Sequence, residues 1–104
     1  MERKPSSWQA VALRDAEQIV DWYIAEAGDA VAARFMDALN ETIASISEFP
    51  GLGSRRYAEQ LGFDNLRFRE IADFPYLIFY LDHESHVMIW RMLHRDRDLA
   101  IRLA

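Results

Sequence analysis

The run YLIFYL at residues 76–81 is apolar at all six positions, and it constrains the fold more than any other part of the chain. A strand with one face in water alternates apolar and polar residues, whereas a strand that is apolar on both faces needs cover on both sides. The run is also far shorter than the roughly 20 apolar residues of a membrane helix. We therefore predict that YLIFYL is a central strand of a sheet.

The segments on either side of this run have the composition of neighbouring strands. In NLRFREI (65–71), Leu66 and Phe68 alternate with Arg67 and Arg69. A short connection, DHES (82–85), leads from the central run to HVMIWRML (86–93) and predicts a hairpin. Strict alternation in HVMIWRML predicts two faces, with Val87, Ile89, Arg91 and Leu93 on one and Met88, Trp90 and Met92 on the other.

The first half of the chain predicts a short strand and two helices. WQAVALR (8–14) has the apolar, partly β-branched composition of a strand. Asp15 and Gln18 then resemble a capping box, and Gly28 is a typical helix stop. Asp29 is positioned to cap a second helix, which should end near Phe49 because Pro50 opposes its continuation. Each predicted helix carries one apolar stripe: Ile19, Val20, Tyr23, Ile24 and Ala27 in the first, and Ala32, Phe35, Leu39, Ile43 and Ile46 in the second.

Together these elements predict an α+β fold in the order β-α-α-β-β-β, with residues 1–104 forming one domain. An antiparallel helical hairpin would pack on a small antiparallel sheet, the only large apolar face available. Residues 50–64 are the one predicted loop. The second apolar face of the sheet would then remain uncovered by the chain and available to a partner. The residues expected on that exposed surface are Tyr76, Tyr80, Met88, Trp90 and Met92.

Composition and charge narrow the class of protein. The chain has no cysteine, which excludes disulfides and thiolate metal sites, and its N-terminus lacks the apolar core of a signal peptide. We therefore expect a cytoplasmic location without membrane contact. The net charge of −5 argues against a protein that binds phosphate backbones, and we expect no direct sequence-specific binding to nucleic acid. Eleven of the twelve basic residues are arginines, however, which suit contacts with carboxylates and phosphates.

In their order and spacing, these segments resemble the RelE/ParE superfamily of type II toxins. The resemblance covers about residues 8–98, and it includes FPGLG (49–53), LRFREI (66–71) and the hairpin YLIFYLDHESHVMIWRMLHRDRD (76–98). Its most specific part, the hairpin that ends in RMLHRDRD (91–98), is similar to the ParE branch. The resemblance implies a RelE/ParE-like fold and a growth-inhibiting toxin that forms a hetero-oligomer with a ParD-like antitoxin.

The two branches of the superfamily imply different functions. ParE-like members inhibit DNA gyrase by binding it, whereas RelE-like members are ribosome-dependent mRNA endonucleases. In the endonuclease alternative, Arg67, Arg69 and Arg91 would neutralise a phosphate and His94 would act as the base. However, RelE-like enzymes carry an arginine where this chain has Leu77, and a tyrosine near the C-terminus that is absent here. The resemblance therefore favours a ParE-like binding inhibitor that has no catalytic residues and no cofactor.

The resemblance also suggests which residues meet the target and the antitoxin. The expected target contacts are Arg91, His94, Arg95 and Arg97; if Arg91 is buried instead, Glu70 on the neighbouring strand is its candidate partner. For the antitoxin, we expect contacts with Trp22, Tyr23, Phe35, Leu39 and Trp90. We expect no functional metal site, because Arg95 and Arg97 interrupt the possible ligands His94, Asp96 and Asp98, and His83 with His86 is a weak two-ligand motif.

Overall fold

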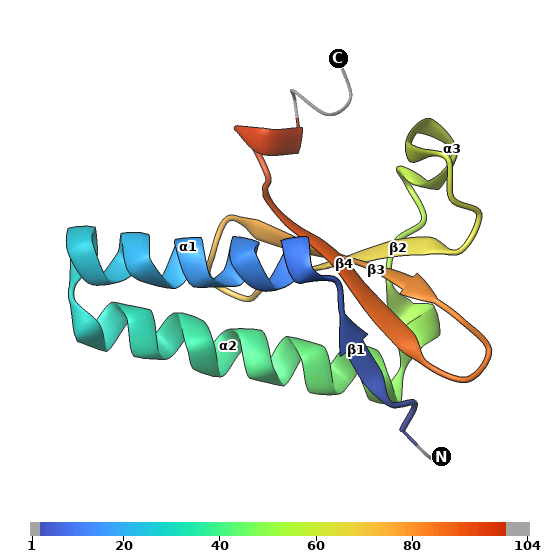
Figure 1. The fold of residues 1–104 in the computed structure, drawn as a ribbon, viewed down its shortest axis with the longest axis horizontal. Coiled ribbons are helices and arrows are strands. Elements are labelled where there is room, and N and C mark those ends of the chain that lie inside the picture. Colours follow the sequence, from blue (N-terminus) through green and yellow to red (C-terminus); the bar gives the residue numbers. More distant parts are fainter. Residues whose placement is uncertain (1–2, 100–104) are drawn as a thin grey trace.

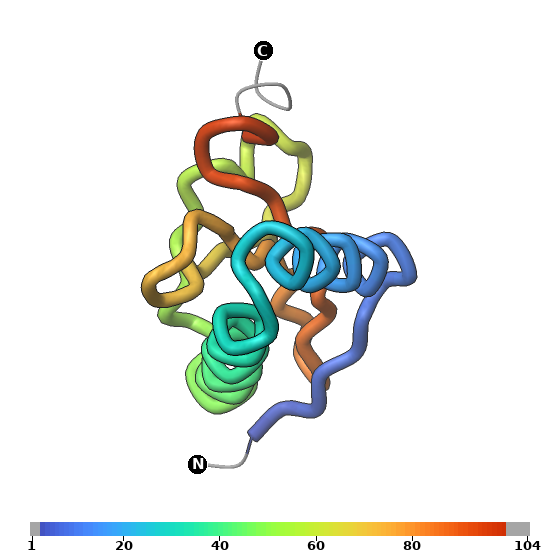
Figure 2. The backbone as a smooth tube through the Cα atoms, turned by 90° about the vertical axis from the view of Figure 1, so that its left-hand side faces the viewer, coloured from blue at the N-terminus to red at the C-terminus, as the bar shows by residue number. Residues whose placement is uncertain are grey.

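Two long helices and a four-stranded sheet form two layers in the computed structural model, which describes residues 3–99. Helices α1 (Ala10–Ala27) and α2 (Asp29–Glu48) run side by side as an antiparallel hairpin on one face of the sheet, and Figure 2 shows them nearly end-on (Figures 1 and 2). This confirms the predicted α+β architecture. The elements in chain order are β1 (Ser6–Trp8), α1 (Ala10–Ala27), α2 (Asp29–Glu48), η1 (Pro50–Leu52), α3 (Ala58–Leu61), β2 (Leu66–Glu70), β3 (Tyr76–Asp82) and β4 (Val87–His94).

The strand predicted to be central lies inside the sheet, whose order is β1-β4-β3-β2. β3 pairs antiparallel with both β2 and β4, and the six residues of YLIFYL are all buried. The expectation of a wholly antiparallel sheet is wrong at one edge, where β1 pairs parallel with β4. Three α-helices, the 3-10 helix η1 and two strands separate β1 from β4 in the chain, so no tight hairpin dictates their relative direction.

The first helix begins earlier than its sequence predicts. α1 starts at Ala10, so most of the predicted strand at residues 8–14 is helical. Ala12 and Ala16 extend the stripe of Ile19 back to this point, and alanine favours helix over strand. Asp15 therefore lies within the helix and does not cap it. The junction is as predicted, because Gly28 (φ 92°) ends α1, and α2 ends at Glu48 before Pro50.

A β-bulge changes the faces of β4. Phe79 pairs with Arg91 and Tyr80 pairs with Ile89, which leaves Trp90 without a partner on β3. An extra residue resets the alternation of the residues that follow it. Strict alternation therefore assigned the end of the strand wrongly: Met92 lies with Val87 and Ile89 in the core under the helices, and Leu93 lies with Met88 and Trp90 on the other side.

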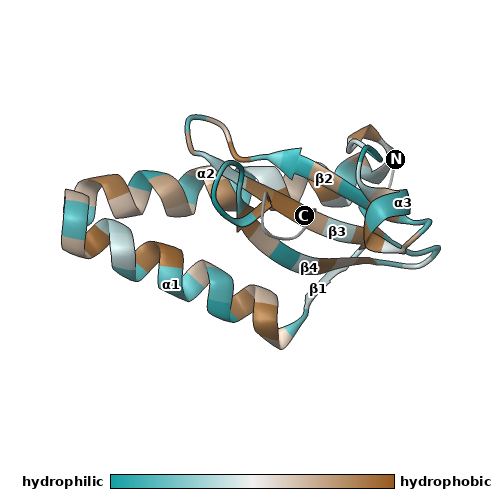
Figure 3. Ribbon diagram, turned by 90° about the horizontal axis from the view of Figure 1, so that it is seen from above, coloured by the Kyte–Doolittle hydropathy of each residue, from teal (hydrophilic) through white to brown (hydrophobic). Residues whose placement is uncertain are grey.

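The second face of the sheet is covered by the chain itself, so the prediction of an open partner surface there is wrong. Figure 3 shows β3 hydrophobic along most of its length, with α3 and the end of β4 on this side (Figure 3). Tyr57 stacks on Phe68 at a centroid distance of 5.4 Å, and Phe63 packs edge-on against Trp90 at 5.3 Å. The predicted loop at residues 50–64 thus contains η1 and α3, and it contributes Ala58 to a second core. The other buried members of this core are Leu66, Leu77, Phe79, Leu81, Leu93 and Leu99.

This covering segment is fixed to the sheet beside Gly53. The Tyr80 hydroxyl donates a hydrogen bond to the Pro50 carbonyl, and Arg67 Nη1 donates one to the Gly53 carbonyl at 2.9 Å. A Cβ on Gly53 would collide with the Tyr80 hydroxyl and lie 2.9 Å from Arg67 Cβ. The second glycine of FPGLG is therefore required by close packing.

Candidate functional site: the C-terminal turn and the helical groove

Arg91, the predicted cation on β4, is paired within the chain. Its Nε and Nη2 donate to the two carboxylate oxygens of Asp15 at 2.8 and 3.1 Å, and the Met92 amide donates to Asp15 Oδ2 at 3.0 Å. Hydrogen bonding to this carboxylate raises the pKa of Arg91. The suggested partner Glu70 is wrong: Glu70 lies 3.5 Å from Arg95 instead. The bulge and the early start of α1 place Arg91 beside Asp15.

The residues after β4 form a hydrogen-bonded turn. His94 Nδ1 accepts from the amides of Asp96 and Arg97, both at 3.1 Å. Asp98 Oδ2 accepts from the His94 amide at 2.8 Å, and Arg97 Nε donates to Asp98 Oδ1 at 3.1 Å. Burial alone would raise the pKa of Asp98, but the His94 amide and Arg97 outweigh it and lower this pKa. We call residues 94–98 the C-terminal turn.

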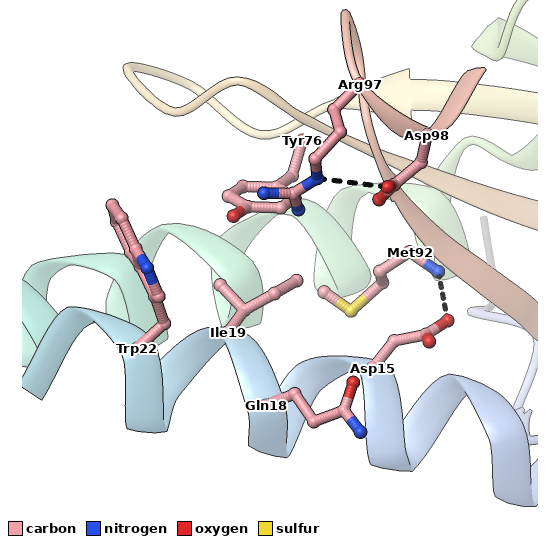
Figure 4. Close-up of a pocket in the computed structure, with 8 residues that line it drawn as sticks. All are labelled: Asp15, Gln18, Ile19, Trp22, Tyr76, Met92, Arg97 and Asp98. Atoms are coloured by element: carbon pink, nitrogen blue, oxygen red, sulfur yellow. Dashed lines mark hydrogen bonds and ion pairs between the residues drawn. The ribbon is translucent and has the colours of Figure 1, made fainter. Parts of the chain in front are cut away.

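A cavity of about 210 Å³ separates this turn from α1 (Figure 4). Arg97 and Tyr76 lie together on one side of it, and Trp22 and Gln18 point toward it from α1 (Figure 4). Trp22 is 54% exposed, so the cavity opens at an aromatic edge. The remaining lining residues are Asp15, Ile19, Met92 and Asp98.

A second hollow, of about 340 Å³, lies between α1 and α2 and is also lined by Trp8 of β1. Leu13 and Met36 line it and are 50% and 47% exposed, so large apolar side chains face solvent there. Glu17 and Asp21 add negative charge along one side. We call this the helical groove, and its further lining residues are Ala16, Val20, Leu39 and Asn40.

The residues predicted to bind an antitoxin do not form one surface. Tyr23 and Phe35 are core residues, buried against Phe74 and Tyr76. Leu39 contributes to the floor of the helical groove, Trp22 lies at the cavity beside the C-terminal turn, and Trp90 is half-buried below Phe63. Sequence reasoning missed Leu13 and Met36. A second apolar stripe that contains Leu13 and Val20, seven residues apart, was a signal that could have identified the groove.

The four residues of the endonuclease alternative are divided between two strands, with Arg67 and Arg69 on β2 and Arg91 and His94 on β4. Arg69 Nη1 donates to Ser45 Oγ on α2 at 3.1 Å, while Arg67 is bonded to the Gly53 carbonyl. Arg91 is held by Asp15, and His94 Nδ1 is occupied by the C-terminal turn. β3 separates β2 from β4, which places the two strands about 10 Å apart. The described residues thus give each candidate its own intrachain partner and no shared phosphate site.

Within residues 3–99, no three His, Cys, Asp or Glu side chains are grouped to hold an ion. His83 and His86 stack across the β3–β4 turn at a centroid distance of 4.7 Å. No helix among these residues is long and apolar enough to cross a membrane.

The fold and the position of the turn define an α+β protein of the RelE/ParE type. A family model described as "ParE toxin of type II toxin-antitoxin system, parDE" matches residues 7–99. The chain belongs to this family of ParE toxins. A solved structure titled "Chromosomal ParDE TA system from P. aeruginosa" is similar in fold, with a TM-score of 0.73, 16% identity, and 88% of this chain and 96% of that chain covered. No curated protein matches the sequence.

Proposed function

We propose that this toxin inhibits growth by binding DNA gyrase, without catalysis of its own, and that a ParD-like antitoxin neutralises it. The observation that carries the proposal is the ParE family match over residues 7–99. The geometry adds support, because the four residues of the endonuclease alternative are bonded to separate partners. The proposed effector surface is the C-terminal turn, where Arg95 and Arg97 are exposed.

Two assays on the purified protein test this proposal. In a gyrase supercoiling assay, we expect the toxin to inhibit supercoiling in a dose-dependent manner and to trap cleaved DNA. In a translating-ribosome assay, we expect the mRNA to remain intact. Cut codons with unaffected gyrase would replace the proposal with the endonuclease alternative, and inactivity in both assays would indicate a chain that only binds its antitoxin.

For the antitoxin, we propose the helical groove as the docking site. α1 and α2 together carry eight acidic and two basic residues, and Glu17 and Asp21 lie on the groove. An apolar groove with acidic sides suits an amphipathic helix with Leu or Ile anchors and flanking Lys or Arg. Of the antitoxin contacts predicted from sequence, Leu39 lies in this groove.

Leu13→Glu combined with Met36→Glu should weaken antitoxin binding at least about tenfold. The two exposed apolar side chains line the groove, and the new carboxylates would be desolvated under a bound helix. Titration calorimetry with the antitoxin's C-terminal segment measures the change. Ile24→Glu is the matched control, because Ile24 is 46% exposed on α1 and does not line the groove. Equal losses in the control and the groove variant would contradict this docking site.

A further inference from the structure

We infer that His94 is a positioning residue: its Nδ1 atom, together with the Asp98 carboxylate, closes the C-terminal turn and fixes the direction in which Arg95 and Arg97 are presented. This role differs from both roles that the residue type suggests, a general base and a direct target contact. The part of the inference that concerns toxicity rests on the proposed function. The part that concerns the turn rests on geometry alone.

The hydrogen bonds around His94 have the pattern of a helix N-cap. One acceptor atom, Nδ1, receives the amides of the second and third following residues, Asp96 and Arg97. These are the bonds that an N-cap Asn or Asp side chain makes to the first amides of a helix. Asp98 reciprocates by accepting the His94 amide, as the acidic residue of a capping box does, although here it lies four residues along and not three.

Both ends of the turn are anchored, so its closure has a directional effect. At its start, His94 pairs with Tyr76, the imidazole packs edge-on against the Tyr76 ring at 5.3 Å, and the Arg95 amide donates to the Pro75 carbonyl at 2.8 Å. At its end, Leu99 is 6% exposed in the second core. Between these anchors the side chains of Arg95 and Arg97 are 50% and 62% exposed. The folded turn therefore holds two arginine side chains that are at least half exposed at one corner of the sheet.

The pattern also fixes the tautomer of His94. An atom that accepts two amide hydrogen bonds carries no proton, so the neutral ring must carry its proton on Nε2. Nδ1 is then unable to take a proton from a substrate without opening the turn. If His94 acts by positioning through Nδ1, replacing it by Asn or by Gln should have different consequences from those expected if it acts as a base through Nε2.

Asparagine and glutamine separate these roles. The Asn Oδ1 atom occupies nearly the position of His Nδ1 and is a favoured N-cap acceptor, whereas the Gln Oε1 atom lies near the position of Nε2. In His94→Asn we expect hydrogen exchange of the Asp96 and Arg97 amides to stay close to wild type. In His94→Gln we expect both amides to exchange about fivefold faster, because a typical cap is lost. Growth inhibition by the full-length toxin should follow the same order: it should stay close to wild type in His94→Asn and be weaker in His94→Gln.

Several results would overturn this inference. One is that the Asp96 and Arg97 amides exchange as slowly in His94→Gln as in wild type, and another is that they exchange faster in His94→Asn. A third is a His94 ring that nitrogen-15 spectra show to be protonated on Nδ1. The last is full toxicity of His94→Gln although exchange shows that its turn is open. Thermal unfolding of both variants, compared with wild type, identifies any change that reflects lost folding. The exchange and tautomer measurements involve no target, so they hold or fail independently of gyrase. If wild-type toxin leaves gyrase unaffected, while exchange and growth inhibition still follow the expected order, only the proposed target is wrong.

Discussion

Replacing Arg95 and Arg97 together by glutamine should weaken binding to gyrase about a hundredfold and abolish growth inhibition. Each residue carries a guanidinium that is at least half exposed on the C-terminal turn. Their bonds to Glu70 and Asp98 are at the surface, so little stability is lost when these pairs are removed. A charge-assisted contact with a partner contributes about 1.5–3 kcal/mol, and the loss of two gives at least the stated factor. Inhibition of supercoiling across a toxin titration measures it.

The matched control is Arg14→Gln with Arg34→Gln, which makes the same change in net charge at two exposed positions on α1 and α2. If this control loses as much activity as the turn variant, general charge and not the turn is responsible. Truncation after Leu93 is a less informative experiment. It removes both arginines, but it also removes Leu99 from the second core and the caps that close the turn. Its loss of toxicity would therefore have two explanations.

Arg91 and His94 were predicted to contact the target together with Arg95 and Arg97, but the structure gives both of them bonds within the chain. The Arg91 side chain is only 20% exposed and is bonded to Asp15 through two nitrogens. His94 uses Nδ1 within the turn. We propose that these two residues act through the structure of β4 and its turn, and that Arg95 and Arg97 make the contact.

The fold was predictable where local pattern alone decides it. The all-apolar YLIFYL run required cover on both sides, and β3 is central. The Gly28–Asp29 junction predicted the end of α1 and the start of α2, and Pro50 predicted the end of α2 to within about a residue. In each case a short segment carries the whole signal, whether apolar residues on both faces of a strand, a residue with positive φ, or a proline that opposes a helix.

The errors arise where distant parts of the chain decide the outcome. A bulge at Trp90 depends on how β4 pairs with β3, and strict alternation gave no sign of it. One extra residue moved Met92 under the helices and turned Leu93 to the other face. The polar composition of residues 50–64 likewise suggested a loop, although Tyr57 and Phe63 pack over the sheet once the chain folds back.

The candidate site shows the same division. That the RMLHRDRD segment ends a strand and enters a charged turn could be predicted from sequence. The partner of Arg91 lies 76 positions away in the chain, on a helix whose start was misplaced by several residues. Local pattern identified Asp15 as a helix cap because a capping box and a helix-interior aspartate can share the same spacing. Only the packing of α1 on β4 distinguishes the two.

Asp15→Ala should therefore lower the free energy of unfolding by about 2–3 kcal/mol, much more than a surface substitution. The Asp15 side chain is 13% exposed, and its carboxylate accepts three hydrogen bonds, two from Arg91 and one from the Met92 amide. Removing it leaves a guanidinium that is largely buried without its counter-charge, and a backbone amide at the bulge without its acceptor. Urea unfolding followed by circular dichroism measures the loss. Asp21→Ala, at an exposed position on the same helix, should change stability by less than about 0.5 kcal/mol.

A double substitution separates the ion pair from the other effects of Asp15. In Asp15→Ala with Arg91→Met, no unpaired charge remains beside α1, and Met fills part of the space of the Arg91 side chain. We expect this variant to be more stable than Asp15→Ala alone, because the cost of the orphaned guanidinium is gone and only the Met92 amide stays unpaired. The two single variants and the double variant form a cycle whose coupling should exceed about 1 kcal/mol for residues in direct contact. Additive losses would mean that the contact between α1 and β4 contributes no stability through this ion pair.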